Sequence, residues 1–173
     1  MKHIETPRLI LREWTETDIP EFARLNSDER VMEYFLKPLS YRETVDFYNR
    51  IQEEFKTHGF GLYAVEDKVT RAFMGYVGLH NVTFEIDFAP TVEIGWRLLP
   101  EFWGKGYATE AAMVCVGYAK RDLKLQEIVS FTSLLNKRSE RVMQKIGMTR
   151  IKEFNHPLVE PHHPLYKHVL YSI

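Results

Sequence analysis

Hydrophobic residues in the first third of the chain follow two different spacings. Residues 6–14, TPRLILREW, follow a break and are rich in apolar residues, which predicts a strand. A helix is predicted to begin near Asp18, because the next apolar residues share one helical face and a proline is tolerated in the first turn. A second helix is predicted from Ser40 to Gly59, because Ser40 and Glu43 fit a capping box and apolar side chains then recur every three or four residues.

From residue 61 onward the pattern predicts mainly strands. The predicted elements are strands at 61–67 and 72–80, a loop at 81–90, a strand at 91–98, a helix at 107–120, a strand at 127–133, a helix at 137–145, and two strands within 148–173 that flank the segment 156–164. Gly75 and Gly78 suggest bulges or close backbone approach, and Gly95 interrupts its strand. The order β-α-α-β-β-β-α-β-α-β-β predicts an α/β (α+β) fold, a mixed sheet of about seven strands with helices on both faces.

The composition is typical of one soluble globular domain spanning residues 1–173, with 45% hydrophobic and 27% charged residues. The formal net charge of −1 gives no overall reason to expect nucleic acid or an anionic membrane as a partner, although it leaves room for a local basic groove. The chain has no run of about 18 apolar residues, and its charged start lacks the apolar core of a signal peptide. We therefore expect a cytoplasmic protein.

The single cysteine and the seven histidines bear on redox and metal chemistry. Cys115 has no partner for an intramolecular disulfide and lies in an apolar helical run, which favours a buried thiol in a reducing compartment over a nucleophile. His156, His162 and His163 lack the helical spacing of a zinc hydrolase and have no cysteine beside them, so no metal is expected. The proline-flanked segment that contains them either shapes a pocket or connects the last strands.

The stretch LPEFWGKGYATEA, residues 99–111, places two glycines where a strand gives way to a helix. Unpaired N–H groups at a helix start suit a phosphate, and a tight turn that needs glycine for its dihedral angles is the alternative. A Walker-type phosphate loop does not fit, because Lys105 is followed by Gly106 rather than by Ser or Thr. A dinucleotide fingerprint needs Gly or Ala at Thr109 and an acidic residue at the far end of the next strand, whereas Glu127 stands at its beginning.

Four segments carry a family resemblance. They are TPRLILREWTETD, GYVGLH, EIGWRLLPEFWGKGYATEAA and NKRSERVMQKIGM, in this order and over nearly the whole chain. Together they resemble the GNAT superfamily of acyl-CoA-dependent N-acyltransferases, in particular the branch of the ribosomal-protein N-terminal acetyltransferases RimJ and RimL. The resemblance implies a GNAT fold with a mostly antiparallel sheet in a single domain. It also implies transfer of the acetyl group of acetyl-CoA to a primary amine, either a protein N-terminus or a small molecule, by a monomer or homodimer.

The resemblance assigns the CoA contacts to the strand-to-helix junction and its surroundings. It implies that the pyrophosphate binds the backbone of Gly104, Lys105, Gly106, Tyr107, Ala108 and Thr109. The backbone of Trp96, Arg97 and Leu98, on a strand that splays from its neighbour, is implied to pair with the pantetheine arm. Asn136 matches a family residue that binds pantetheine, and a helix N-cap is its alternative role. Trp103 replaces the family's usual Gln or Arg, and either packs in the core or borders the CoA.

In the family the acceptor amine attacks the thioester directly, so the candidate catalytic residues are a base and an acid. Glu93 is the candidate base, and an ordinary strand carboxylate paired to an arginine is the alternative. Met143 occupies the position of the family's general-acid tyrosine, which leaves Ser139 as the candidate in its place or as a plain surface or packing serine. Glu85 and Asp87 either attract a cationic amine or are solvated loop charges.

Two other classes of function stay open at this level. A non-catalytic acyl-CoA-binding sensor fits the missing tyrosine at Met143, and thiol release that depends on an acceptor would exclude it. An NAD-dependent enzyme would require nicotinamide-cofactor binding at the glycine junction.

Overall fold

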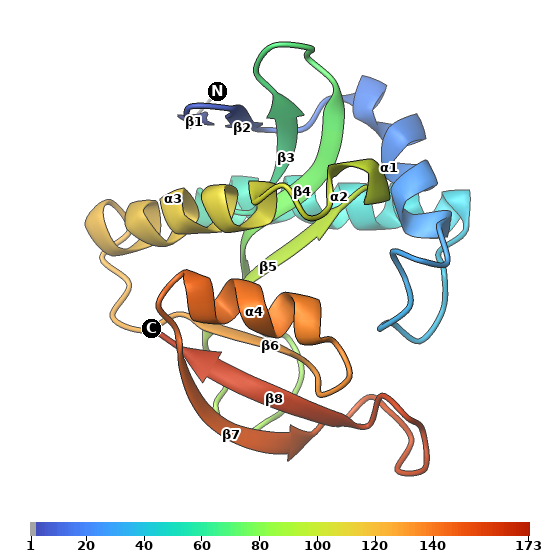
Figure 1. Ribbon diagram of the computed structural model, residues 1–173, viewed down its shortest axis with the longest axis vertical. Coiled ribbons are helices and arrows are strands. Elements are labelled where there is room, and N and C mark those ends of the chain that lie inside the picture. Colours follow the sequence, from blue (N-terminus) through green and yellow to red (C-terminus); the bar gives the residue numbers. More distant parts are fainter. Residues whose placement is uncertain (1–2) are drawn as a thin grey trace.

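The computed structural model describes residues 3–173 and places its strands in one sheet of eight. The strands are β1 (Ile4–Glu5), β2 (Leu9–Arg12), β3 (Leu62–Asp67), β4 (Phe73–Asn81), β5 (Val92–Leu98), β6 (Val129–Ser133), β7 (Thr149–Asn155) and β8 (Lys167–Ser172). The helices are α1 (Ile19–Ser27), α2 (Tyr41–His58), α3 (Tyr107–Arg121) and α4 (Lys137–Lys145), with short 3-10 turns at Glu16–Asp18 and Pro100–Phe102. The strand order is β1-β2-β3-β4-β5-β6-β8-β7, and neighbours are antiparallel except for β5 and β6 (Figure 1). The predicted order of elements and the mixed sheet are confirmed, with one strand more than expected.

The first long strand is shorter than the sequence predicts. Of residues 6–14, the segment Leu9–Arg12 forms β2, and the two-residue strand β1 precedes it. The Thr6 side-chain oxygen accepts a hydrogen bond from the Leu9 N–H at 2.8 Å, and the Thr6 N–H donates to the Leu9 carbonyl at 3.0 Å. Such local bonds compete with sheet pairing and close a turn. The strand predicted at 6–14 is therefore present but shorter, and β1, which precedes the turn, is the additional strand.

The boundaries of α2 follow from local chemistry. The Glu43 N–H donates to Ser40 Oγ at 3.2 Å, and the Ser40 N–H donates to the Glu43 carboxylate at 2.8 Å. The helix ends at Gly59, whose φ of +73° lies in the left-handed region. Both predicted ends are confirmed. None of the helices formed by residues 3–173 is long and apolar enough to cross a membrane.

Helices cover both faces of the sheet (Figure 1). On one face, Ala111, Ala112 and Cys115 of α3 are fully buried against the central strands. On the other face, Phe22 of α1 and Ile51 of α2 pack in a second apolar cluster. Burial on both sides makes the central strands a rigid platform for the site.

Gly75 and Gly78 lie where neighbouring strands approach closely. A Cβ atom at Gly75 would lie 2.1 Å from the Arg97 carbonyl oxygen, and one at Gly78 would lie 2.3 Å from the Gly61 carbonyl oxygen. The close backbone approach that the sequence suggests is therefore confirmed, and the register of β3 and β4 also shifts next to Gly75, between Val65 and Glu66.

β5 and β6 are parallel neighbours that separate soon after they meet. They pair at Glu93 and Val129, and Ser130 Oγ donates to the Ile94 carbonyl at 2.9 Å. Beyond this point the two strands diverge (Figure 1). The splayed strand expected from the sequence is present. After Ile94, β5 still pairs with β4, but its other edge, which faces β6, has no strand partner within residues 3–173.

Candidate functional site

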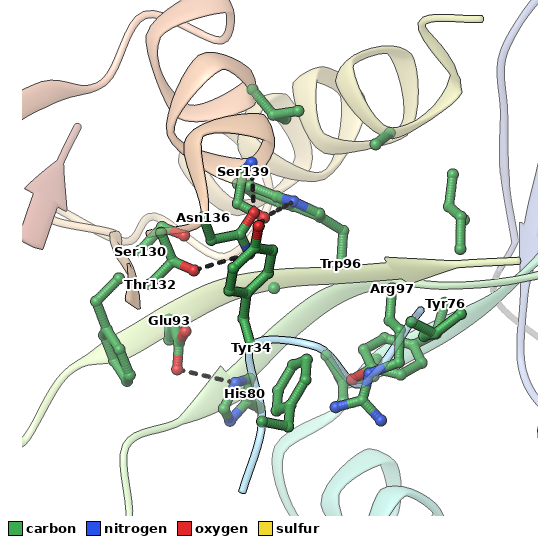
Figure 2. Close-up of a pocket in the computed structure, with 18 of the residues that line it drawn as sticks. Tyr34, Tyr76, His80, Glu93, Trp96, Arg97, Ser130, Thr132, Asn136 and Ser139 are labelled. Atoms are coloured by element: carbon green, nitrogen blue, oxygen red, sulfur yellow. Dashed lines mark hydrogen bonds and ion pairs between the residues drawn. The ribbon is translucent and has the colours of Figure 1, made fainter. Parts of the chain in front are cut away.

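A large cavity opens where β5 and β6 diverge. Its volume is about 1150 Å³, and the loop before α3, the start of α4 and the loop between α1 and α2 border it. Figure 2 shows Trp96 and Ser139 on one side of β5 and Glu93, His80 and Arg97 on the other. The residues predicted from the sequence that line it are Glu93, Trp96, Arg97, Leu98, Gly104, Gly106, Tyr107, Ala108, Thr109, Asn136 and Ser139.

The loop before α3 presents a row of free backbone N–H groups. Gly104 and Gly106 have φ angles of +73° and +81°, which glycine adopts without strain, and Gly106 immediately precedes the helix. Within residues 3–173, none of the N–H groups of residues 104–109 donates a hydrogen bond to a protein acceptor. Together with the helix dipole, such groups are suited to bind an anion such as pyrophosphate. The glycine turn considered in the sequence is present, and the anion site stays a prediction.

Arg8 and Glu110 brace this loop from the outside. Arg8 Nη1 donates to the Lys105 carbonyl at 3.0 Å, and Arg8 Nε donates to Glu110 Oε2 at 2.6 Å. Thr6 Oγ1 also donates to Glu110, at 2.6 Å. Burial alone would raise the pKa of Glu110, but these hydrogen bonds outweigh it and hold the pKa below its usual value. Sequence spacing does not reveal this brace, because its partners lie about a hundred residues apart and share no local signal.

Trp103 closes one end of the open β5 edge. Its Nε1 donates to the Leu98 carbonyl at 2.7 Å, and the Arg138 guanidinium carbon lies 4.3 Å from its ring centroid. Trp103 is partly buried against both apolar clusters and also lines the cavity. The packing role considered for it in the sequence is therefore confirmed, and its contact with CoA stays a prediction.

Asn136 is the N-cap of α4, and its side chain orients Ser139. Asn136 Oδ1 accepts from the Ser139 N–H at 3.2 Å, and Asn136 Nδ2 donates to Ser139 Oγ and to Thr132 Oγ1, both at 3.1 Å. Trp96 Nε1 donates to the same Ser139 Oγ at 3.3 Å. Because the serine oxygen accepts from two donors, its own hydroxyl hydrogen is left to donate to another group.

Glu93 is buried and paired with a histidine, not with the arginine considered in the sequence. The two side chains face each other across β4 and β5, with His80 Nε2 at 3.1 Å from Glu93 Oε2. Burial alone would lower the pKa of His80, but the charge and hydrogen bond of Glu93, together with Glu54, raise it. A buried carboxylate–imidazole pair is suited to accept a proton.

Arg97 places a buried cation on the same side of β5 as this pair (Figure 2). Its Nη1 donates to Asn26 Oδ1 at 2.6 Å, and its Nε has no hydrogen-bond partner. The guanidinium carbon lies 4.1 Å from the ring centroid of Phe35 and 5.3 Å from that of Tyr76. Burial lowers the pKa of Arg97, yet an arginine stays protonated in proteins. The family resemblance assigns a role in pantetheine binding to the backbone of Arg97, and no sequence pattern indicates a role for its side chain.

A tyrosine that the sequence analysis does not single out lines the cavity. Met143, at the position of the family tyrosine, is 1% exposed and packs in the core. Tyr34 comes from the loop between α1 and α2, and its hydroxyl points toward Asn136 and Ser139 in Figure 2. A loop residue far from the recognised segments carries no periodic signal that could have indicated it.

The Cys115 thiol lies in the apolar core. Cys115 is fully buried, and burial raises the pKa of its thiol to about 12. A thiol with such a pKa is protonated at neutral pH, which confirms the expected buried thiol. Residues 3–173 contain no group of three or more His, Cys, Asp or Glu side chains that could hold a metal ion.

The segment 156–164 shapes one end of the cavity. His156 lines it and packs against His168, with 4.8 Å between the ring centroids. Burial lowers the pKa of His156 and lowers that of His168 to about 4. In the loop before β5, Glu85 and Asp87 are exposed, and Asp87 forms an ion pair with Lys152.

Comparisons with known proteins agree with this geometry. The chain matches the family described as acetyltransferase (GNAT) domain over residues 8–149. The Bacillus subtilis protein YkkB is 34% identical over 140 residues, which cover 79% of this chain and 80% of that protein.

Solved structures share the fold along almost the whole chain. A GNAT-family acetyltransferase from Bacillus anthracis is 27% identical, with a TM-score of 0.83 over 99% of this chain and 98% of that one. The spermidine N-acetyltransferase of Vibrio cholerae, in complex with CoA and spermine, is 20% identical, with a TM-score of 0.78 over 97% of this chain and 96% of that one. These likenesses confirm the fold class expected from the sequence.

Proposed function

The chain belongs to the GNAT family and is an acetyl-CoA-dependent acyltransferase, and we propose that it transfers the acetyl group to a primary amine by direct attack. The observation that carries this proposal is the row of free N–H groups at residues 104–109, beside a cavity that also contains a buried carboxylate. The thioester supplies an activated acyl group. The residues of the chain bind acetyl-CoA, orient the amine and move protons.

Acetyl-CoA fits the groups around the cavity. The N–H groups of Gly104 to Thr109 bind the pyrophosphate, because the glycines leave the backbone bare and the helix dipole favours an anion. The open edge of β5 from Trp96 to Leu98 pairs with the pantetheine arm as an added strand would. Asn136 contributes the remaining acceptor capacity of its Oδ1, since both hydrogens of its Nδ2 are already engaged.

Glu93 accepts the proton of the acceptor amine. His80 binds Glu93 Oε2 and so fixes the carboxylate toward the cavity. The freed lone pair of the amine forms the new bond to the thioester carbonyl carbon, and the carbon–sulfur bond breaks. The products are the acetamide and CoA, whose thiolate receives a proton on leaving.

Ser139 relays a proton to the departing thiolate: it donates its hydroxyl hydrogen to the sulfur and takes up in turn the second proton that the amine nitrogen loses as the amide forms. Hydrogen bonds from Asn136 and Trp96 to the serine oxygen polarise the hydroxyl and make it a better donor. Tyr34 lines the same cavity with its hydroxyl on the same side, and it is the second candidate for this role.

The acceptor is a protein N-terminal α-amine or the amine of a small molecule. An α-amine, with a pKa of about 7.7–8.0, needs less help from a base than a lysine amine, whose pKa is about 10.4. The four segments that resemble RimJ and RimL support placing the protein in that branch. We further propose that it works in the cytoplasm as a monomer or homodimer, without a metal, nucleic acid or membrane.

Release of free CoA thiol across a panel of peptides and small amines tests the proposed function. We expect release that depends on the amine, with acetyl-CoA and protein without an amine, and acetyl-CoA and amine without the protein, as the controls. Binding of acetyl-CoA with no thiol release for any amine would instead indicate a sensor. Thermal stabilisation by NAD and not by CoA would indicate the nicotinamide enzyme.

A further inference from the structure

Arg97 is a buried cation that no carboxylate in the described part of the chain neutralises. It is 8% exposed, its Nε is buried without a partner, and the neighbouring group that favours its charge is the Tyr76 hydroxyl. Neutral groups hold it in place, since Asn26 Oδ1 accepts from its Nη1 and Phe35 stacks on it. Asn26 is in turn fixed by Thr44, to which its Nδ2 donates at 3.3 Å. An uncompensated buried charge is costly, so this arrangement indicates that an anion binds there.

The cation and the Glu93–His80 pair face the same stretch of the cavity. Along this face of β4 and β5 the register pairs are Tyr76 with Arg97, Gly78 with Gly95, and His80 with Glu93. The middle pair consists of two glycines and has no side chains. A Cβ atom built at Gly95 would lie 3.8 Å from the His80 ring, which is an ordinary van der Waals contact. The floor between the carboxylate and the guanidinium is therefore bare, which leaves room for a short chain with one charged group at each end.

We propose that the acceptor is a small amine that also carries a carboxylate, with its carboxylate bound to Arg97 and its amine at Glu93. This inference rests on the proposed acetyl transfer and narrows its acceptor. Asn26 Oδ1 accepts from Nη1 and the Nε atom is buried, so Nη2 is the group of the guanidinium that remains to bind the acceptor carboxylate, in a charge-assisted hydrogen bond.

The distance between the two ends favours an acceptor with several methylenes. Glu93 and Arg97 are four residues apart on one strand, so their Cα atoms are about 13 Å apart at about 3.3 Å per residue. The two side chains shorten this span, and an ω-amino acid bridges it better than glycine does. A diamine would bring a second cation to Arg97 and would be repelled.

Three acceptors of equal length test the inference: γ-aminobutyrate, its amide γ-aminobutyramide, and putrescine. The quantity measured is kcat/KM for thiol release, with glycine and ε-aminohexanoate added to bracket the length. We expect γ-aminobutyrate to exceed its amide by about tenfold to 100-fold, and putrescine by at least as much. Equal rates for the amide, or a higher rate for putrescine or for the α-amine of a peptide, would overturn the inference and leave acetyl transfer intact. No thiol release with any amine would overturn both.

Substitutions at Arg97 test whether this side chain causes the preference for an acceptor with a carboxylate. In Arg97→Met the ratio of kcat/KM for γ-aminobutyrate to that for its amide is expected to fall to about one, because no cation remains to bind the carboxylate. Arg97→Lys keeps a charge without the planar fork and is expected to lower the ratio severalfold. The matched control is Arg50→Met, which removes an exposed arginine that lines the same cavity and should leave the ratio unchanged.

Two results would contradict this assignment. One is a ratio that survives both Arg97 variants, and the other is an equal fall in Arg50→Met. If Arg97→Met does not fold, Arg97→Lys decides the question, since a purely structural role for Arg97 would lower the rates with both acceptors equally and leave their ratio in place.

Discussion

At the residue scale, Glu93 is the group on which proton transfer depends. Glu93→Gln keeps the size of the side chain and removes its basicity, so kcat at neutral pH is expected to fall by about 100-fold or more. The loss should shrink as the pH rises, because the acceptor amine then deprotonates without help. Measuring kcat against pH with saturating substrates checks this. A loss that stays constant across the pH range would remove Glu93 from the proton transfer.

A second measurement on Glu93→Gln does not depend on catalysis: it is the pKa of the His80 ring. Burial lowers the pKa of His80, and Glu93 with Glu54 more than offsets this, so the pKa lies above 6.5. In Glu93→Gln the burial remains, and NMR titration of the His80 ring is expected to show a lower pKa. Protonated His80 stabilises the fold below its unfolded pKa of about 6.5, and this contribution is lost as the pH rises through the raised pKa. The stability advantage of the wild type over Glu93→Gln should therefore narrow as the pH rises through the raised pKa of His80.

Ser139 and Tyr34 are separable as donors to the leaving thiolate. Ser139→Ala is expected to lower kcat by about 100-fold, the typical effect of removing one donor from a developing anion. The cap of α4 survives this change, because Asn136 Oδ1 binds the backbone N–H of residue 139. Tyr34→Phe is compared under the same conditions, and kcat and the affinity for CoA are measured for both variants. A larger loss in Tyr34→Phe would transfer the role to Tyr34.

Sequence reasoning reached some of these residues and missed others for a physical reason. The resemblance indicated Glu93, and the N-cap of Asn136 was readable because capping chemistry is local. His80 and the side chain of Arg97 gain their meaning from the register of β4 and β5. That register is set across the loop 82–91, and a loop of this length does not fix a pairing as a two-residue turn does.

At the scale of elements, the junction before α3 is the part most sensitive to backbone change. Gly106→Ala would place a side chain at φ +81° with its Cβ 3.5 Å from Arg8 Nη2. We expect a loss of about 1–2 kcal/mol in the free energy of unfolding and at least tenfold weaker CoA binding, measured by denaturation and calorimetry. The matched control is Gly117→Ala inside α3, where a Cβ meets nothing within 4 Å. This control should stabilise the helix by about 0.5–1 kcal/mol and leave CoA affinity unchanged. Equal CoA affinity in both variants would contradict the anion site.

The elements that the sequence predicted well are those whose capping residues and apolar periodicity lie within or next to the element itself. The helix expected at 107–120 is α3 (Tyr107–Arg121), and the helix expected at 137–145 is α4 (Lys137–Lys145). The strand expected at 6–14 begins only at Leu9, because residues 6–8 form a turn in which Thr6 binds the Leu9 N–H and a distant partner, Glu110. The two-residue strand β1 is too short for alternation to be visible.

At the scale of the whole molecule, the sheet consists of two parts joined by a narrow seam. β4 and β5 pair over seven register positions, whereas β5 and β6 pair at Glu93 and Val129. The first part carries the loop before α3, and the second carries α4 with Asn136. A ligand that binds both the N–H groups of residues 104–109 and the start of α4 therefore bridges the seam.

Hydrogen exchange tests whether acetyl-CoA forms this bridge. Binding to the native state alone stabilises it, by about 2.7 kcal/mol at a ligand concentration of 100 times Kd. Because opening of the seam exposes both sides of the site, slower amide exchange is expected in residues 104–109 and at the start of α4 at the same ligand concentration. Peptides from β3 (Leu62–Asp67), on the far side of β4, should change little, and the whole effect should weaken in Gly106→Ala. Protection confined to one part of the sheet, or centred elsewhere, would mean that CoA does not lie between β5 and β6, and the proposed contacts with Asn136 and the β5 edge would then be wrong.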